Sequence, residues 1–527
     1  MSVQPTYPGV YIEEIPSGVR TITGVATSIT AFVGRALQGP LNEPFTITSF
    51  SDYERSFGGL SIDSTMSYAV KDFYLNGGSL AIIVRIAAVD ALAANMALPG
   101  VESPPDALML FATSEGEWGN SISVEVNYNT GDPTAPVISP PEEGDTDTFN
   151  LIIYYNGVKA EEHLNVSLLQ SAIRFLPRVL EQQSTLLTAE KDIIGNWVVS
   201  DARPAEITVP LVAQNGDDGA ELMATDYTNG ELNKTGIHAL KKADLFNLLC
   251  IPPPTRLADT DATVYQAAMK ICADERAMLL VDPPFAWGTS PATAAANAIA
   301  GLGTLGLSGI EARNAALYFP RVKQADPNRK GQVDTFVPSG MVAGIFSKTD
   351  STRGVWKSPA GIDAALGGIQ GLQVNLTDQE NGQLNPLGIN CLRSFPVTGR
   401  VLWGARTLRG ADQLADEYKY IAVRRTALFI EESLYRGTQW VVFEPNDEPL
   451  WAQIRLNIGA FMHNMFRQGA FQGATPREAY MVKCSRETTT QNDINQGIVN
   501  ILVGFAPLKP AEFVFIKIQQ LAGQIDS

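Results

Sequence analysis

The stretch AMLLVDPP, Ala277–Pro284, decides the fold class, because a short apolar run that ends in Asp-Pro-Pro is typical of a buried strand. A helical pattern over Ala262–Arg276 precedes it. An Ala-rich helical segment and the strand-like NAALYFPRV, 314–322, follow it. This alternation predicts parallel strands covered by helices, and HALKKADLFNLLCIPPP, 238–254, repeats it as a helix and then a strand.

The same signals appear on the N-terminal side of this core. Strands are predicted at Ala31–Gly34, Phe45–Ile47 and Leu80–Ile86. One helix is expected to open at Ser51 or Asp52, and another to close at Gly77-Gly78. The sequence therefore predicts an α/β and α+β multidomain chain with a mixed-sheet core.

An acidic, Pro- and Gly-rich region interrupts this core between Pro99 and Gly236. From Pro99 to Leu232 there are 22 acidic and 5 basic residues, so this region carries the whole formal charge of -17. Strands are predicted at Ile122–Tyr128 and Phe149–Tyr155, with an exposed loop at Gly131–Asp147. We interpret the region as an inserted β-rich domain whose acidic face is solvated, the alternative being a site for a cation or a partner.

The third region, from Phe336, is predicted to contain two helices and several strands. The first helix, Asp412–Tyr435, has an apolar face marked by Leu414, Ile421, Leu428 and Tyr435, for core packing or an intermolecular coil. The second, Leu450–Arg467, has the buried stripe Ile454, Ile458, Phe461 and Met465, and a second face with Arg455, Met462 and Phe466 for a partner. Strands are expected in WVVFEP, AYMVKCS, IVNILVGFAP and AEFVFIKIQ.

The two ends of the chain have strands that need partners. YPGVYIEEIPSG, Tyr7–Gly18, alternates apolar and polar residues between two prolines, and a Thr/Gly/Ser-rich tether follows it. At the other end, Val514, Ile516 and Ile518 form one face of a strand, and Phe513 and Phe515 form the other. A terminal strand that is apolar on both faces tends to aggregate unless it is covered, so we expect pairing with another molecule.

No arrangement of residues indicates catalysis or metal binding. Gly301–Gly306 matches Gly-x-Gly-x-x-Gly but follows a helix, which is the wrong context for a dinucleotide site. Asp282 ends a strand without a companion His, Lys or carboxylate, so a capping or turn role is favoured. The four cysteines and three histidines are widely spaced, which favours buried thiols over a disulfide framework or zinc site.

The composition also bounds the partners and the compartment. A basic stripe is missing from the sequence, which disfavours nucleic acid, and the apolar runs are too short to span a membrane. The first residues do not form a signal peptide, so synthesis in a cytoplasm is expected.

Several stretches resemble the tail sheath proteins of contractile phages, R-type bacteriocins and contractile injection systems. The resemblance covers both flanks and is weak from Pro99 to Gly236, where such proteins carry variable insertions. Its residues are YPGVYIEEIPSG (7–18), TAFVGRALQGPLNEPFTITSFSDYERSFGG (30–59), SYAVKDFYLNGG (67–78), YIAVRRTALFIEESL (420–434), WVVFEPNDEPLWAQI (440–454), GATPREAYMVKC (473–484) and VGFAPLKPAEFVFIKIQQ (503–520).

The resemblance implies a sheath subunit that polymerises helically as stacked rings around an inner tube. Baseplate and terminal cap proteins would be its other partners, and contraction would drive the tube through a target envelope. No nucleotide-binding motif is visible, so we expect contraction without ATP, powered by energy stored in subunit interfaces. The alternatives are a static shell-forming protein and, less favoured, a soluble α/β enzyme using Asp282 or Gly301–Gly306.

The resemblance also suggests a domain map and interface residues. The map has an arm (1–25), a first core part (26–98), the acidic outer domain (99–235), a second core part (236–335) and a tube-facing C-terminal domain (336–527). The tube contacts are expected at Arg455 and Arg467, the alternative being intramolecular ion pairs. The exchanged strands would use Tyr7, Gly9, Val10, Tyr11, Ile12, Phe513, Val514, Phe515, Ile516 and Ile518.

Overall fold

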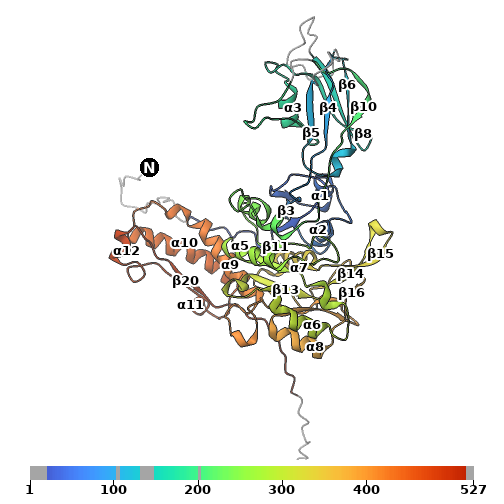
Figure 1. The fold of residues 1–527 in the computed structure, drawn as a ribbon. Coiled ribbons are helices and arrows are strands. Elements are labelled where there is room, and N and C mark those ends of the chain that lie inside the picture. Colours follow the sequence, from blue (N-terminus) through green and yellow to red (C-terminus); the bar gives the residue numbers. More distant parts are fainter. Residues whose placement is uncertain (1–19, 102–106, 131–147, 200–202, 518–527) are drawn as a thin grey trace, which may run out of the picture.

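An eight-stranded mixed sheet forms the centre of the molecule in the computed structural model, which describes residues 20–101, 107–130, 148–199 and 203–517 (Figure 1). Its six inner strands are mutually parallel, and only the two outermost strands run antiparallel to their neighbours. In spatial order the strands are β18 (Gly399–Leu402), β17 (Ile389–Phe395), β13 (Ala315–Phe319), β12 (Met278–Val281), β11 (Leu248–Cys250), β1 (Thr30–Gly34), β3 (Ala81–Arg85) and β2 (Phe45–Ile47).

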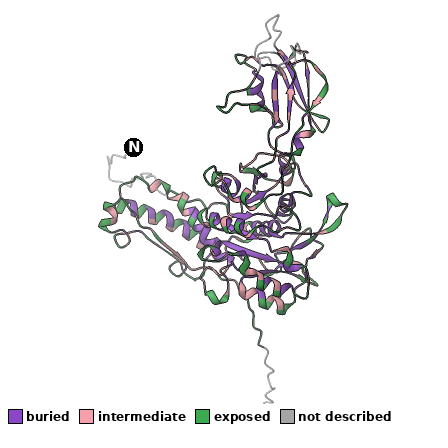
Figure 2. Cartoon of the chain, in the orientation of Figure 1, coloured by how far each residue is buried: buried purple, intermediate pink, exposed green. Residues whose placement is uncertain are grey.

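Helices cover both faces of this sheet, as the alternation of elements predicts. In β12, Leu279 and Val281 belong to the hydrophobic cluster that contains α5 (Ala262–Asp274) and α6 (Ala294–Gly301). Met278 and Leu280 face the other way, into the cluster of α2 (Thr65–Leu75) and α7 (Ser339–Arg353). Successive strand residues point to opposite faces, so a strand buried on both faces is apolar at every position. Figure 2 shows buried residues concentrated on the central strands and the helices against them.

The strands predicted on the N-terminal side are confirmed, whereas two helix predictions need correction. Helix α1 (Phe50–Phe57) is capped by Ser49, whose side chain accepts a hydrogen bond from the backbone N–H of Asp52, so it opens before Ser51. The predicted helix after His238 is a 3₁₀ segment, Gly236–Lys242.

The acidic region folds as a separate β-rich unit with its own hydrophobic cluster. The chain leaves the central sheet after β3 and returns to it at β11, and in Figure 1 the unit stands at one end of the molecule. The two predicted strands are confirmed, and the predicted loop Gly131–Asp147 lies outside the described residues. Its sheets are β10 (Ile207–Val212), β6 (Ile122–Asn127), β7 (Thr148–Tyr155), β8 (Val158–Ser167), and β4 (Asn95–Leu98), β5 (Leu108–Ala112), β9 (Leu187–Ala189).

A short three-stranded sheet and a C-terminal helix pair complete the fold. The sheet contains β14 (Val322–Asp326), β15 (Gln332–Phe336) and β16 (Gly371–Leu372). The pair, α9 (Ile421–Gly437) and α10 (Glu448–Arg467), shares a hydrophobic cluster with the small sheet β19 (Tyr480–Lys483) and β20 (Leu502–Phe505). Strands β17 and β18 belong to the central sheet, so the core sheet continues beyond Phe336, where the sequence placed the start of the C-terminal domain.

The predicted helix Asp412–Tyr435 begins nine residues too early. Asp412–Leu414 is one 3₁₀ turn, and Ala415 has φ 46°, which ends it. Arg406 binds Asp412, and Arg409 binds Asp416, so ion pairs hold this segment as a loop. Two of the four positions in the predicted apolar stripe are half exposed, namely Leu414 and Tyr435.

Two of the expected C-terminal strands do not form in the described chain. WVVFEP begins inside the 3₁₀ turn Gln439–Val441, and Phe443 then has φ 69°. Residues 511–517 form no strand in the single subunit. Among the described residues no helix is both long and apolar enough to cross a membrane.

Candidate functional site

The N-terminal segment, residues 20–28, lies on the C-terminal helix pair before it enters β1. The backbone N–H of Arg20 donates to the Asn457 side chain of α10 at 3.1 Å. The guanidinium of Arg20 lies 4.6 Å above the Trp440 ring centre. The segment therefore contacts the body of the molecule from Arg20 onward.

Small residues allow the segment to approach helix α9 closely. A Cβ at Gly437 would lie 2.6 Å from the side chain of the buried Ile22, and a Cβ at Gly24 would lie 2.8 Å from the Phe429 ring. The backbone N–H of Val25 donates to Ser433 Oγ at 3.2 Å. Larger side chains at either glycine would push the segment off the helix.

A buried ion pair fixes the inner end of the same segment. Arg425 of α9 donates to both carboxylate oxygens of Asp350, at 2.9 and 2.6 Å, and the two side chains are 3% and 4% exposed. Thr27 joins the pair twice, since its hydroxyl donates to Asp350 at 2.7 Å and its carbonyl accepts from Arg425 at 2.8 Å. Helices α7 and α9 and the N-terminal segment therefore meet at one charged point.

Helix α10 presents an outward face next to this segment. The predicted buried stripe of Ile454, Ile458, Phe461 and Met465 is confirmed, whereas Met462, expected on the second face, is fully buried. The outward face carries instead Gln453, Leu456, Ala460, His463 and Arg467, which are exposed.

The two arginines expected to bind a tube differ. Arg455 donates to Glu448 at 2.7 Å and to the carbonyl of Cys484, as the intramolecular alternative predicts. Arg467 is exposed and forms no ion pair within the described residues.

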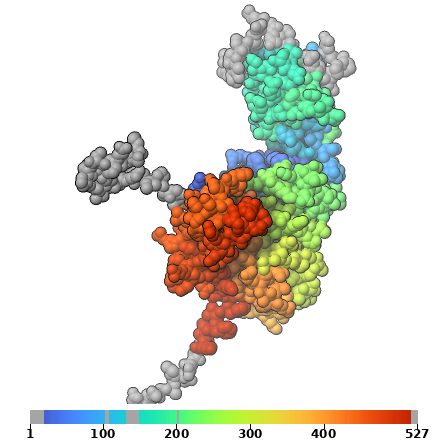
Figure 3. All heavy atoms as spheres, turned by 90° about the vertical axis from the view of Figure 1, so that its left-hand side faces the viewer, coloured from blue at the N-terminus to red at the C-terminus, as the bar shows by residue number. Residues whose placement is uncertain are grey.

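The sheet β19–β20 has two edges that no described strand covers. A two-stranded sheet is marginally stable alone, and each outer edge has unused hydrogen-bonding groups. Beyond it, Phe513, Val514, Phe515 and Ile516 are 67–88% exposed, and in Figure 3 this end of the chain leaves the body. The strand residues Tyr7, Gly9, Val10, Tyr11, Ile12 and Ile518 lie outside the described residues.

Asp282 is a helix-capping residue. Its buried carboxylate accepts from the backbone N–H of Ser339 at 2.9 Å and from the Ser339 hydroxyl at 2.8 Å, at the start of α7. Burial raises the pKa of Asp282 to about 7, although the two Ser339 hydrogen bonds oppose this. The glycine pattern Gly301–Gly306 ends helix α6, with Gly306 at φ 63°, so it opens no phosphate-binding helix.

Replacing Asp282 by Asn is expected to flatten the pH dependence of stability. The native carboxyl binds its proton more tightly than the unfolded one, so its contribution is full below pH 4 and is lost as the pH rises to about 7. Asn still accepts the capping hydrogen bond without burying a charge. Thermal unfolding midpoints from pH 5 to 8 should fall less in Asp282→Asn than in the parent or in the exposed control Asp63→Asn. Equal slopes would contradict the buried titration.

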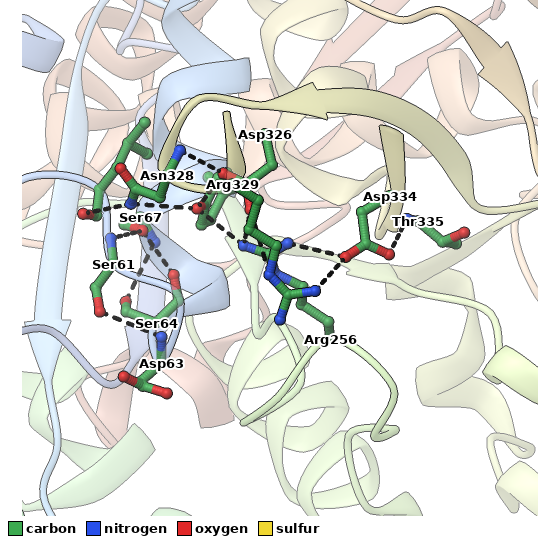
Figure 4. Close-up of polar contacts among 12 residues, drawn as sticks. Ser61, Asp63, Ser64, Ser67, Arg256, Asp326, Asn328, Arg329, Asp334 and Thr335 are labelled. Atoms are coloured by element: carbon green, nitrogen blue, oxygen red, sulfur yellow. Dashed lines mark hydrogen bonds and ion pairs between the residues drawn. The ribbon is translucent and has the colours of Figure 1, made fainter. Parts of the chain in front are cut away.

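A second cluster of buried charges serves packing (Figure 4). Arg256 forms ion pairs with Asp326 and with Asp334, and Tyr68 of α2 donates to Asp326 at 2.8 Å. Burial raises the pKa of Asp326, but the hydrogen bonds from Tyr68 and Arg256 outweigh burial, and the pKa lies below its usual value. The cluster ties the hairpin β14–β15 to α2. The four cysteines are buried thiols, as predicted, and no group of metal ligands is found among the described residues.

The sequence matches two protein-family models, which together cover most of the central sheet and the C-terminal helix pair. The phage tail sheath protein central domain matches residues 225–408, and the phage tail sheath C-terminal domain matches residues 415–520. Together they cover more than half of the chain. The chain belongs to the phage tail sheath protein family. It is therefore a structural sheath protein and not an enzyme.

Individual relatives agree with this assignment. A tail sheath protein of Vibrio phage KVP40 is 28% identical over 211 residues, which are 38% of this chain and 30% of that protein. One of Burkholderia phage BcepMu is 25% identical over 287 residues, or 51% of this chain and 57% of that protein. The sheath-family chain thus spans well under two thirds of these relatives' length.

The fold agrees with solved sheath structures along the whole chain. The PVC sheath of an extracellular contractile injection system, solved in its contracted state, has a TM-score of 0.57 at 20% identity. The match covers 98% of this sheath-family chain and 99% of that one.

Proposed function

We propose that this protein polymerises helically around an inner tube and contracts to drive the tube through a target envelope. The observation that carries the proposal is that one subunit has both an exposed apolar chain end, Phe513–Ile516, and a two-stranded sheet with two uncovered edges. One subunit thus carries both a strand to donate and an edge to accept. The solved sheath of similar fold is in a contracted state, which supports a shape change.

The exchanged strands are the links between subunits in this proposal. Phe513, Val514, Phe515, Ile516 and Ile518 of one copy would add to one edge of a neighbour's β19–β20 sheet. Tyr7, Gly9, Val10, Tyr11 and Ile12 of another copy would add to the other edge. Two added strands would give a four-stranded sheet whose backbone groups are paired, joining bodies that still move relative to each other.

The β-rich unit would be an inserted outer domain, facing away from the tube. In Figure 1 it lies far from α10, so if α10 faces the tube the unit points outward. Its acidic surface would then be solvated, which favours solubility of the particle. The other partners would be the inner tube protein, the baseplate and a terminal cap. The particle would be assembled in the bacterial cytoplasm.

Charge reversal at Arg467 and Arg455 is expected to weaken binding to the tube. Arg467 lies unpaired among the described residues on the outward face of α10, while Arg455 shares its charge with Glu448. An exposed contact contributes up to about 1 kcal/mol, so Arg467→Glu should reduce affinity about fivefold per subunit, and Arg455→Glu less.

The effect of these substitutions can be measured by co-sedimentation of the sheath protein with purified tube. The control is Arg178→Glu, an exposed arginine on α3 (Leu176–Gln183) of the β-rich unit. Unchanged tube binding of the double variant Arg455→Glu/Arg467→Glu would reject this face of α10 as the contact.

Electron microscopy of the purified chain, with and without the tube protein, tests the proposal as a whole. Rings or hollow tubes that occur in a long and a short helical form would support a contractile sheath. Closed shells, or tubes of one fixed pitch under every trigger, would instead favour a static shell.

A further inference from the structure

A cluster of four side chains, which we call the clamp, holds the C-terminal segment at Glu512, the last residue with a side-chain hydrogen bond in the described part of the chain. Arg406 donates through Nε and Nη2 to the two carboxylate oxygens of Glu512, both at 2.7 Å. Asn385 donates to the same carboxylate at 2.8 Å, and Tyr420 donates to it at 3.1 Å. The four side chains form a two-pronged ion pair with two further hydrogen bonds, the strongest kind of polar contact a surface segment can make.

The receiving side of the clamp is rigid. Arg406 is 1% exposed, and its third nitrogen donates to Asp412 at 3.0 Å. Its backbone exchanges two hydrogen bonds with the Asn390 side chain on β17, each 2.7 Å long. The clamp therefore connects the end of the chain to the central sheet, and not only to the C-terminal sheet from which the segment comes.

The Glu512 carboxylate in the clamp is also negatively charged at neutral pH. Burial raises the pKa of the Glu512 carboxyl, but the hydrogen bonds from Arg406 and Asn385 outweigh burial, and the pKa lies below its usual value. The carboxylate thus stays ionised at neutral pH. Salt screens such a partly buried pair only weakly.

The exposed strand residues follow the clamp without any spacer. Glu512 is mostly buried, whereas the next residue, Phe513, is 67% exposed. Leu508–Phe513 also forms one wall of a groove of about 840 Å³, with Trp356 and Trp403 on its other walls.

We propose that Arg406, Asn385 and Tyr420 are positioning residues that hold Glu512 so that the following strand leaves the subunit at a fixed point and in a fixed direction. This inference rests on the proposed strand exchange. When the central sheet fixes the position of the strand, the effective concentration of that strand at a neighbour's sheet edge is higher than for a strand on a flexible tail. In this design the C-terminal strand is a rigid connection between one subunit and the next.

The position of the strand can be measured without polymerisation, through pulsed electron spin resonance between two labels. The four native cysteines are buried, so introduced ones can be labelled selectively. Suitable sites are Val514→Cys, two residues beyond the clamp, and Val397→Cys, an exposed site in the turn between β17 and β18. The labelled full chain is diluted with unlabelled full chain, so that only distances within one subunit are seen.

Glu512→Ala is expected to broaden the distance distribution and to lower the yield of polymer about tenfold, since a loose strand has a lower effective concentration. Glu512→Gln removes the charge but keeps the side-chain volume, and it should show the same broadening. It replaces Glu512→Ala in the test if that variant folds poorly. The matched control is Glu487→Ala, an exposed glutamate in the same domain, which should change neither quantity. Thermal unfolding reports whether each variant keeps its fold.

The outcomes separate this inference from the proposed function. A narrow distribution in Glu512→Gln would overturn the clamp, whatever happens to the polymer. A broad distribution with a normal polymer yield would overturn its role in assembly. Normal polymerisation of a chain that ends at Glu512 would instead overturn the exchange of the C-terminal strand, and the distance measurement would still report on the clamp.

Discussion

A chain that begins at Gly18 is expected to fold as a normal subunit and yet form no sheath polymer at the concentration at which the full chain assembles. The body of the subunit is anchored from Arg20 onward, through Asn457, Trp440 and the ion pair at Thr27, and the truncation removes none of these contacts. The polymer loses the donated strand Tyr7–Ile12 at every contact. With several hydrogen bonds lost, each contributing about 1 kcal/mol, assembly should need a concentration at least about a hundredfold higher.

Electron microscopy and sedimentation of the truncated chain measure this loss, and thermal unfolding of the same sample checks its fold. A matched control keeps the length of the chain but replaces Val10 by Pro, which removes one backbone donor from the strand. Its polymer should be weakened but not abolished. Tubes from the truncated chain at the normal concentration would reject the exchange of the N-terminal strand.

Removing the carboxylate of Asp350 is expected to have the largest effect on stability. The Asp350→Ala variant leaves Arg425 buried and charged without its partner. The free energy of unfolding should therefore fall by about 4 kcal/mol. Thr27 loses its hydroxyl acceptor in the same variant, so the N-terminal segment should also loosen on α9. Urea unfolding gives the loss of free energy, and proteolysis near Thr27 reports the loosening.

A second variant separates the two parts of this effect. In Asp350→Leu/Arg425→Met the buried charge disappears together with its partner, so most of the free energy of unfolding should return. The hydrogen bonds to Thr27 do not return, and the segment should stay sensitive to protease. Equal instability of the single and double variants would show that the ion pair is not what stabilises this point.

The central sheet was predictable from sequence because its strands are buried on both faces. Each reads as a short apolar run between turn residues, as in Leu279–Val281, and this signal is local. The start of α9 was not predictable in this way. Leu414 continues the seven-residue spacing of Ile421 and Leu428, but ion pairs hold its segment as a loop, and one of them joins Asp416 to Arg313, 103 positions away.

The anchors of the two arms were beyond sequence reasoning for the same physical reason. Asp350 and Arg425 are 75 positions apart, and Arg406 and Glu512 are 106 apart, so no spacing marks them as pairs. The only hint at the C-terminal end was an isolated acid, Glu512, directly before an apolar run. The resemblance to the sheath family suggested that both ends are exchanged strands, while the structure was needed to find the side chains that hold the segments next to them.

The connection between the β-rich unit and the central sheet has a consequence for how such chains diversify. The strands that enter and leave the unit run side by side, since Leu92 and Asp217 exchange backbone hydrogen bonds of 2.8 and 2.9 Å. The unit between them has a hydrophobic cluster of its own, and its other contacts with the core include hydrogen bonds from Arg85 to the Glu115 carbonyl and from Tyr155 to Gln38. We therefore expect that a related chain could carry a different insertion at this point, or only a tight turn, while the residues that form the central sheet stay the same.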